Sequence, residues 1–250
     1  MPPRAQPWTE SFAVRSYEVT PHGRASLQTL CNYCQEVAGN HAQALGLSRD
    51  AMLDRGLAWV LMRLRLQVQR YPEWGHTVRV ETWPSGVDSL YATRAFLLRD
   101  GNAAPLARGT SAWAVIDVKR RRPVRIPDDV YDIEPPDRPR PLDFATRRVH
   151  ALEQADRARH FDVRFSDLDV NQHVNNVRYV EWALEAAPRE MLLTQQPTEI
   201  DIQFRAETGL GETVVTQLQQ DADRLLHRLR RTRDDKTVAQ ATTQWAELDG

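Results

Sequence analysis

The fold is decided by a stretch that occurs twice in the sequence, first as Phe12-Ala-Val-Arg15 and again as Phe161-Asp-Val-Arg164. At the same offset, Glu36 in the first copy corresponds to Glu185 in the second. Self-similarity over such distances is the sign of a repeated structural unit, and it has to be recognised before any single motif is interpreted. The sequence therefore predicts an internal duplication.

Further matches continue in the same order toward the end of the chain. Leu64-Arg-Leu-Gln-Val68 matches Ile200-Asp-Ile-Gln-Phe204, and Thr110-Ser-Ala-Trp113 matches Thr242-Thr-Gln-Trp245. The offset becomes smaller along the chain, because the first copy has longer connections between its matching segments. This order predicts two copies of one fold rather than a chance similarity.

A proline-rich run between the copies marks their boundary. It predicts an N-terminal repeat over 1–122, a linker over 123–146 and a C-terminal repeat over 147–250 that carries Asp169, Asn171 and His173. Segments rich in proline favour an extended conformation, so we expect the linker to have little structure of its own.

Each copy shows one pattern of strands and helix. Apolar residues alternate at Phe161, Val163 and Phe165, which predicts a strand with one buried face. Helical spacing predicts a helix over 27–44 in the first copy and over 174–187 in the second. Later strands are predicted at 59–69, 77–84, 91–98 and 106–117, and at 199–205, 213–220, 224–232 and 237–248. This order predicts an α+β fold in which each half is a long antiparallel sheet wrapped around a central helix.

Composition limits the possible classes of function. The 250 residues are 41% hydrophobic and 27% charged, as in ordinary globular proteins, and the formal net charge of −1 provides no overall attraction for nucleic acid or an anionic membrane. No run approaches the ~18 apolar residues of a membrane-spanning helix. The N-terminus also lacks the features of a signal or transit peptide. The sequence thus predicts a cytoplasmic protein without membrane insertion or a nucleic-acid partner.

The only two cysteines, Cys31 and Cys34, form a C-x-x-C pair inside the predicted helix over 27–44. Such a pair can be redox-active or can bind a metal. The strand that would precede a thioredoxin-like motif is absent here. We therefore expect both cysteines to be buried as small hydrophobic side chains.

Three polar residues, Asp169, Asn171 and His173, come just before the helix of the second copy. They alternate, so in an extended segment their side chains would lie on the same side. A carboxylate, an amide and an imidazole that converge can perform acid–base chemistry on a carbonyl compound. Free N–H groups at the start of the following helix could stabilise an oxyanion.

The alternative is that these residues only form a turn and cap the helix. The two copies help to separate the two interpretations, because a purely structural role would be needed in both. The first copy instead has Thr20, His22 and Arg24 at the equivalent positions. Glu207 is a fourth candidate, since its counterpart is Tyr71, although an exposed glutamate at a strand end would look the same. We predict one catalytic site per chain, in the second copy.

Residues that both copies share favour structural roles. Glu36 and Glu185 occupy equivalent helix positions, which suggests a structural pairing, for example with an arginine. Trp113 and Trp245 are also shared and are expected in the core.

Two basic clusters could contact an acidic carrier protein by electrostatic complementarity. The first consists of Lys119, Arg120, Arg121, Arg122 and Arg125, and the second of Arg228, Arg230, Arg231 and Arg233. A well-solvated turn or strand would have the same composition, so both interpretations stay open.

The segment Asp167-Leu-Asp-Val-Asn-Gln-His-Val-Asn-Asn-Val-Arg-Tyr179 resembles the acyl-acyl carrier protein (acyl-ACP) thioesterases of plants and bacteria. Supporting similarity extends over nearly the whole chain, through residues 11–19, 72–83 and 111–123. The resemblance implies a tandem, or double, hot-dog fold in which the two copies form an intramolecular pseudo-dimer. It also implies hydrolysis of acyl-ACP thioesters to free fatty acid and carrier thiol, which terminates fatty acid biosynthesis.

The family's catalytic residues map onto Asp169, Asn171, His173 and Glu207. Plant members typically have a cysteine after that glutamate, whereas Thr208 follows it here, so a cysteine nucleophile at this position is excluded. The implied mechanism has Asp169 or Glu207 activating water, or Asp169 attacking directly, while His173 polarises the carbonyl and Asn171 orients the reacting groups. No cofactor is implied, and the motif has no recognisable set of metal ligands.

Two other functions are compatible with the sequence. One is a hot-dog thioesterase acting on acyl-coenzyme A. The other is a non-catalytic acyl-ligand-binding protein, which would need an output domain for which no segment remains. The internal pseudo-dimer makes a monomer sufficient, although a homodimer is common in such folds.

Overall fold

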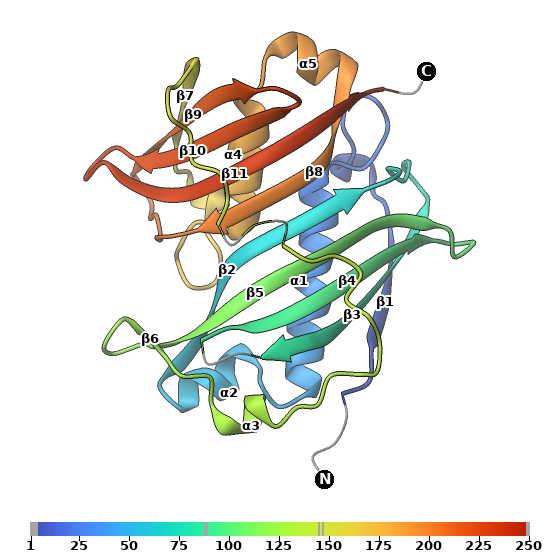
Figure 1. Ribbon diagram of the computed structural model, residues 1–250, viewed down its shortest axis with the longest axis vertical. Coiled ribbons are helices and arrows are strands. Elements are labelled where there is room, and N and C mark those ends of the chain that lie inside the picture. The colour runs from blue at the N-terminus through green and yellow to red at the C-terminus, as the bar shows by residue number, and fades with distance from the viewer. Residues whose placement is uncertain (1–4, 88–89, 145, 147, 249–250) are drawn as a thin grey trace. The chain divides into compact units, whose positions relative to one another are not determined.

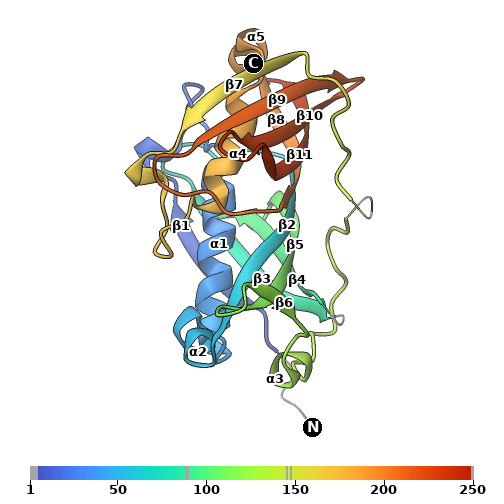
Figure 2. The same cartoon turned by 90° about the vertical axis from the view of Figure 1, so that its left-hand side faces the viewer.

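The computed structural model describes residues 5–87, 90–144, 146 and 148–248. The chain divides into two compact units, unit 1 over Met1–Asp143 and unit 2 over Phe144–Gly250. The division falls inside the predicted linker over 123–146, whose limits stay a prediction. In each unit a central helix lies against one face of a curved sheet (Figures 1 and 2).

Unit 1 contains an antiparallel sheet in the order β1-β3-β4-β5-β2, with β6 pairing to β5. Its strands are β1 (Trp8–Ala13), β2 (Leu57–Val68), β3 (Thr77–Val87), β4 (Ala92–Asp100), β5 (Pro105–Asp117) and β6 (Arg122–Val124). Its helices are α1 (Leu27–Ala44), α2 (Arg49–Asp54) and α3 (Asp128–Tyr131). The helix predicted over 27–44 is confirmed at both ends.

Unit 2 repeats this topology with the order β8-β11-β10-β9-β7. Its strands are β7 (Arg157–Asp162), β8 (Gln195–Phe204), β9 (Thr213–Asp221), β10 (Arg224–Arg231) and β11 (Lys236–Glu247). Its helices are α4 (Asn176–Glu185) and α5 (Arg189–Thr194). The order of elements predicted from the sequence is confirmed in both units.

The core of each unit lies between the sheet and the long helix. In unit 1, Leu30 and Val37 of α1 are fully buried, as are Val78 and Val80 of β3, the strand against which α1 packs. In unit 2, Val180 of α4 and Ile202 of β8 are likewise fully buried. Removing each such side chain from water contributes roughly 1.5–3 kcal/mol. Cys31 and Cys34 lie in the core of unit 1 as free thiols, which confirms the expectation of buried cysteines.

The two units also share individual side-chain contacts at equivalent positions. The ring of Phe12 stacks on Tyr33 with centroids 4.4 Å apart, and Phe161 stacks on Trp182 at 5.8 Å. The indole N–H groups of the two shared tryptophans also make equivalent bonds, Trp113 to Ser111 Oγ at 2.8 Å and Trp245 to Thr243 Oγ1 at 2.9 Å. These two tryptophans are half-buried, so the expectation that they belong to the core is only partly met.

The strand predicted through Phe165 is too long. β7 ends at Asp162, and residues Phe165–Asp167 form a single 3-10 turn. A 3-10 turn has three residues per turn, so the two-residue alternation of a strand stops there. Phe165 is 81% exposed, and Asp167 is the residue that the turn buries.

The linker prediction is wrong for its first part. Instead of an extended chain, this part forms β6, which pairs with β5, and the short helix α3. Ile126 and Val130 are buried in a cluster with Met52 and Val115 of unit 1. Burial of these two apolar side chains explains why this proline-rich segment is ordered.

Among the described residues, none of the helices combines the length and the apolar character that a membrane span requires.

Candidate active site

The segment that carries the polar motif is a tight turn. Leu168 and Val174 form an isolated antiparallel bridge, the N–H of Asp169 donates to the C=O of His173 at 2.8 Å, and the N–H of Gln172 donates to the C=O of Asp169 at 3.0 Å. Gln172 has a φ of 62°, in the left-handed region. The prediction of an extended segment with three side chains on one side is therefore wrong, because these bonds fold the chain back on itself.

The carboxylate of Asp169 is part of this turn. Its Oδ1 accepts from the N–H of Asn171 at 2.8 Å and from the N–H of His173 at 3.4 Å. Its Oδ2 accepts from Asn171 Nδ2 at 3.4 Å. This is the arrangement in which an aspartate side chain replaces a backbone acceptor in a turn. Asp169 and Asn171 are thus brought together.

Unit 1 builds the same turn without a carboxylate. The N–H of Thr20 donates to the C=O of Arg24 at 2.8 Å, and the N–H of Gly23 donates to the C=O of Thr20 at 2.9 Å. Thr20 Oγ1 accepts from the N–H of His22 at 3.3 Å, as Asp169 Oδ1 accepts from Asn171. A hydroxyl therefore suffices for the structural part of the task. The negative charge of Asp169 is additional to what the turn requires.

Glu207 lies next to His173. The Nε2 atom of His173 is 3.4 Å from Oε2 of Glu207, with 38% and 53% of the respective side chains exposed. The two residues are brought together by the backbone, because the N–H of Val174 donates to the C=O of Thr208 at 2.9 Å. The structure thus places Glu207, the fourth candidate, beside His173.

The four candidates thus form two contacting pairs, Asp169 with Asn171 and His173 with Glu207. The two pairs are connected through the backbone, where His173 donates to Asp169. All four side chains are partly or largely exposed, so a substrate can approach them. A carboxylate beside an imidazole is a common arrangement for proton transfer.

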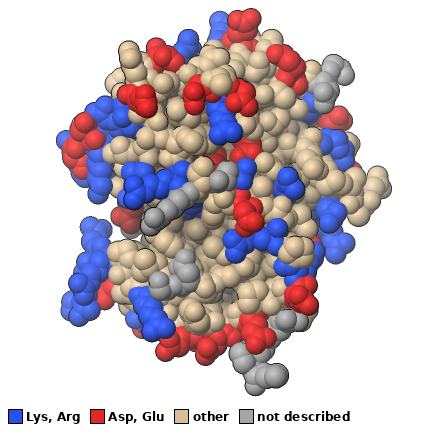
Figure 3. Space-filling model, viewed as in Figure 1, with Lys and Arg blue, Asp and Glu red and all other residues tan. Residues whose placement is uncertain are grey.

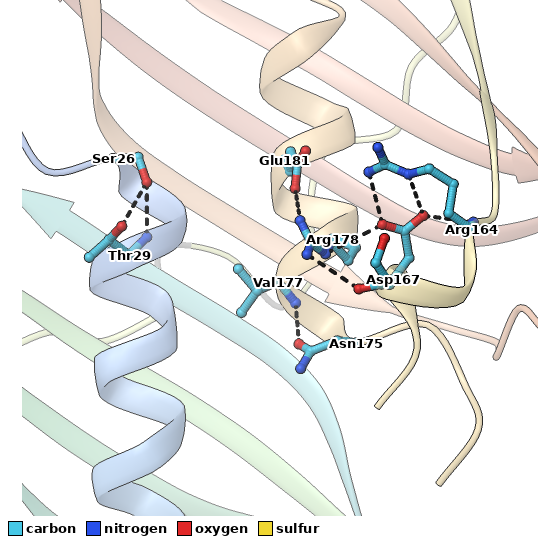
Figure 4. A network of polar contacts seen from close by, with 9 residues as sticks. Ser26, Thr29, Arg164, Asp167, Asn175, Val177, Arg178 and Glu181 are labelled. Atoms are coloured by element: carbon cyan, nitrogen blue, oxygen red, sulfur yellow. Dashed lines mark hydrogen bonds and ion pairs between the residues drawn. The ribbon is translucent and has the colours of Figure 1, made fainter. Parts of the chain in front are cut away.

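The helix that follows offers fewer free N–H groups than the sequence suggests. α4 begins at Asn176, and Asn175 Oδ1 accepts from the N–H of Val177 at 3.0 Å (Figure 4). The N–H of Arg178 donates to the C=O of Asn175 at 2.9 Å. The cap therefore satisfies part of the helix terminus.

Asp167 is a buried charged residue that the sequence interpretation did not single out. Its side chain is fully buried between Arg164 and Arg178, with Oδ1 at 3.0 Å from Arg164 Nη2 and 3.5 Å from Arg178 Nε (Figure 4). Burial alone would raise the pKa of Asp167, but the hydrogen bonds from Arg164 and the charges of both arginines outweigh it and lower the pKa.

An equivalent contact in unit 1 indicates that Asp167 has a structural role. Its counterpart Glu18 accepts from the backbone N–H of Arg15 at 2.8 Å, as Asp167 accepts from Arg164 at 2.8 Å. An acidic residue three positions after an arginine in both copies was the signal that could have revealed this pair.

The cysteines are excluded from the chemistry. Burial raises the pKa of Cys31 to about 12 and that of Cys34 well above its usual range, so neither thiol ionises near neutral pH. Both lie in unit 1, whereas the four candidates lie in unit 2. Thr208, which follows Glu207, is 1% exposed.

Glu185 has the predicted arginine partner. Its Oε2 atom is 2.9 Å from Arg159 Nη1, and Arg159 also donates to the C=O of Glu185 at 2.5 Å. Glu36 instead accepts from Asn40 Nδ2 at 3.4 Å. These contacts support structural roles for both glutamates.

The first basic cluster has Lys119, Arg120 and Arg121 in the turn between β5 and β6, Arg122 at the start of β6 and Arg125 just after β6, and its five side chains are exposed. Figure 3 shows blue side chains gathered at the left edge of the face, where Figure 1 places this turn. Asp117 accepts from the backbone N–H of Arg120 at 2.8 Å. The arginines of the second cluster bind side chains of unit 2. For example, Arg228 donates to Gln217, and Arg233 forms an ion pair with Glu212.

Comparison with protein families gives two consecutive matches. Residues 6–133 match the model described as the acyl-ACP thioesterase N-terminal domain, and residues 150–247 match the acyl-ACP thioesterase C-terminal domain.

Curated relatives agree with these models. The chain is 35% identical over 259 residues to a chloroplastic palmitoyl-acyl carrier protein thioesterase of Cuphea hookeriana, covering 96% of this chain and 62% of the relative. It is 32% identical to oleoyl-acyl carrier protein thioesterase 1 of Arabidopsis thaliana, covering 95% of this chain and 75% of the relative. The chain spans 62% and 60% of the length of the first two curated Cuphea relatives that it matches.

Solved structures also resemble nearly the whole chain. The 12:0-ACP thioesterase from Umbellularia californica has a TM-score of 0.86 at 29% identity, covering 97% of this chain and 98% of the other. The putative oleoyl thioesterase from Lactobacillus plantarum has a TM-score of 0.85 at 27% identity, covering 98% of both chains. The fold is accordingly the tandem hot-dog predicted from the sequence.

Proposed function

The chain belongs to the acyl-ACP thioesterase family, and from that membership we propose that it hydrolyses acyl-ACP thioesters to free fatty acid and carrier-protein thiol. The observation that carries the proposal is the difference between the two units. Both build the same turn, but only unit 2 has Asp169, Asn171, His173 and Glu207 there. A carboxylate that the turn does not need, beside a carboxylate–imidazole pair, is suited to acid–base catalysis.

In the proposed reaction Glu207 removes a proton from water, and the resulting hydroxide adds to the thioester carbonyl carbon. Glu207 is favoured over Asp169 as the base because Asp169 Oδ1 already accepts the N–H groups of Asn171 and His173. His173 donates a hydrogen bond to the developing oxyanion, and Asp169 holds the amide of Asn171, which orients the substrate. Collapse of the intermediate breaks the C–S bond, and the departing thiolate takes the proton that Glu207 removed from water, which restores the Glu207 carboxylate. The thiol leaves easily because its pKa is about 8.5.

The carrier protein is the proposed acidic partner. We infer that it docks on the exposed first basic cluster, which consists of Lys119, Arg120, Arg121, Arg122 and Arg125. Charge complementarity of this kind mainly raises the rate of association and weakens with salt. Replacing the five residues with glutamine should raise KM for acyl-ACP at low salt and leave kcat unchanged.

The test of the activity is a hydrolysis screen over acyl-ACP substrates that differ in chain length and unsaturation, with Asp169→Asn as the inactive control. We expect turnover by the wild type and a loss of about a thousandfold or more in Asp169→Asn with the fold intact. Near-normal rates in that variant would contradict the assigned site. The same acyl group on coenzyme A distinguishes the acyl-CoA thioesterase alternative, and a bound thioester that survives incubation would indicate a non-catalytic binding protein.

We also propose that the enzyme acts in the cytoplasm. Its two cysteines are free thiols, in keeping with a reducing compartment. Fractionation of the cells that express it, followed by immunodetection, tests this assignment.

A further inference from the structure

The loop that carries Glu207 is fixed at three consecutive residues. The C=O of Glu207 accepts from Arg231 Nη1 at 2.5 Å, and the C=O of Thr208 accepts from the N–H of Val174 at 2.9 Å. The N–H of Gly209 donates to Glu212 Oε2 at 2.7 Å. Of the three bonds, the one from Arg231 acts on the peptide group of Glu207 itself. It therefore controls the direction in which the Glu207 side chain leaves the backbone.

Arg231 is itself held rigidly. Its Nε and Nη2 atoms bind the two oxygens of Asp234 at 3.0 and 2.7 Å, and Nη1 lies 3.8 Å from Glu212 Oε2. Only 11% of its side chain is exposed. A planar guanidinium bound at both edges loses little further freedom when it donates one more bond. The bond to Glu207 is thus preorganised.

The residues that make this arrangement in unit 2 are replaced in unit 1. In the sheet register Arg231 is paired with Val214, and Asp100 of unit 1 is paired with Val78. Val214 and Val78 close the matching Gly-x-Thr-Val segments of the two copies. Unit 1 therefore has an aspartate where unit 2 has Arg231, and Tyr71 where unit 2 has Glu207. Unit 1 links the same two segments from side chain to side chain, since Arg70 Nη2 donates to Asp100 Oδ2 at 2.5 Å. In unit 2 the link runs instead to the peptide carbonyl of the residue that carries the candidate carboxylate.

We propose that Arg231 is a positioning residue that holds Glu207 against His173, through the peptide carbonyl of Glu207 and with Asp234 as its anchor. The inference rests on the proposed function and extends it. Among the described contacts, Arg231 reaches Glu207 only through the backbone, so it does not take part in the reaction itself. Small displacements of a catalytic group, of the order of 1 Å, can lower a rate by about a hundredfold.

The test compares Arg231→Met and Arg231→Lys with a matched control, Arg228→Met. Arg228 is on the same strand and donates to Gln217 at 2.8 Å, but no described contact links it to the Glu207 loop. We expect Arg231→Met to lower kcat for acyl-ACP about 10- to 100-fold with KM changed less than about twofold. Arg231→Lys keeps the positive charge and can still donate to the Glu207 carbonyl, so it should recover part of kcat, and Arg228→Met should match the wild type.

A double-mutant cycle with Glu207→Gln separates positioning from general destabilisation. If Arg231 acts through Glu207, Arg231→Met should change kcat less than about twofold in the Glu207→Gln background, while its effect on the midpoint of urea unfolding is equal in both backgrounds. An equal loss of kcat in both backgrounds, or none in either, overturns the proposal.

A spectroscopic measurement keeps this proposal distinct from the proposed function. If the wild type hydrolyses no acyl-ACP, the function fails, and the contact can still be observed through the imidazole ¹H–¹³C signal of His173, assigned with His173→Gln. Arg231→Met and Glu207→Gln should both displace this signal, and Arg228→Met should not. An unmoved signal in Arg231→Met means that Arg231 does not set the contact.

Discussion

At the scale of the residue, Asp169 provides both a hydrogen-bond acceptor for its turn and a negative charge. The equivalent residue in unit 1, Thr20, provides only the acceptor. Asp169 Oδ1 accepts the N–H of Asn171, as Thr20 Oγ1 accepts the N–H of His22 in unit 1. Since threonine forms this bond in an equivalent turn, the carboxylate can be removed without removing the acceptor.

We therefore predict that Asp169→Thr folds like the wild type and is inactive. The urea midpoint should change by less than the equivalent of about 1 kcal/mol, because the turn bond is retained. The value of kcat should fall by about a thousandfold or more. Asp169→Ala is the control, since it lacks both the charge and the acceptor and should lose stability as well. Substantial turnover by Asp169→Thr would show that the charge is not needed.

The candidate site residues that the sequence singles out are those that differ between the copies at matched positions. Asp169, Asn171, His173 and Glu207 stand out for this reason. That they form two contacting pairs could be learned only from the structure. Arg231 also differs between the copies, because its counterpart in unit 1 is Asp100. It could not be found by matching the sequences, since the strand register that aligns these two residues is a property of the folded sheet.

At the scale of the element, the two central helices begin with equivalent caps. Ser26 Oγ accepts from the N–H of Thr29 at 3.1 Å at the start of α1, and Asn175 Oδ1 accepts from Val177 at 3.0 Å at the start of α4 (Figure 4). A cap of this kind contributes about 1 kcal/mol.

We predict that Ser26→Ala and Asn175→Ala each lower the free energy of unfolding by about 1 kcal/mol. Only Asn175→Ala should lower kcat, because Asn175 is two residues from His173 and fixes where the turn meets α4. Urea unfolding and acyl-ACP hydrolysis measure the two effects. Equal activity losses in both variants would mean that the caps act only through global stability.

Element boundaries followed from sequence where apolar periodicity continued to the end of the element. The predicted strand over 224–232 is observed as Arg224–Arg231, and the predicted strand over 213–220 as Thr213–Asp221. The strand predicted through Phe165 was wrong. Phe165 lies in a 3-10 turn, but in the sequence it continues the apolar alternation of the preceding strand. The helix predicted over 174–187 is observed as Asn176–Glu185, because Val174 is a bridge residue and Asn175 is the cap.

At the scale of the whole molecule, each unit buries a histidine. Burial, together with the charge of Arg94, lowers the pKa of His41 to about 4, and burial lowers the pKa of His227 to about 3. His227 is fully buried and has its Nε2 atom 2.9 Å from Thr243 Oγ1. Both imidazoles are therefore neutral in the folded protein at neutral pH.

We predict that stability falls as the pH is lowered from about 6.5 toward 3. In this range the unfolded chain binds more protons than the folded one, because each histidine has its usual pKa near 6.5 only when unfolded. The free energy of unfolding should therefore decrease by up to about 1.4 kcal/mol per pH unit for each histidine.

Urea unfolding at several pH values measures this slope. His227→Leu should have a shallower slope than the wild type between pH 6 and 4, whatever its absolute stability. His150→Leu removes an exposed histidine and should leave the slope unchanged. An unchanged slope in His227→Leu would mean that other groups govern the acid sensitivity.

The two cysteines of the chain have a practical consequence for future measurements. Cys31 and Cys34 are buried, and the pKa of each thiol is raised far from neutrality, so alkylating reagents should not modify the native protein. A cysteine introduced at an exposed position such as Tyr17, which is 78% exposed, would then be the only thiol open to a fluorophore or spin label. The natural chain thus serves directly as the background for site-specific labelling, with both of its own cysteines left in place.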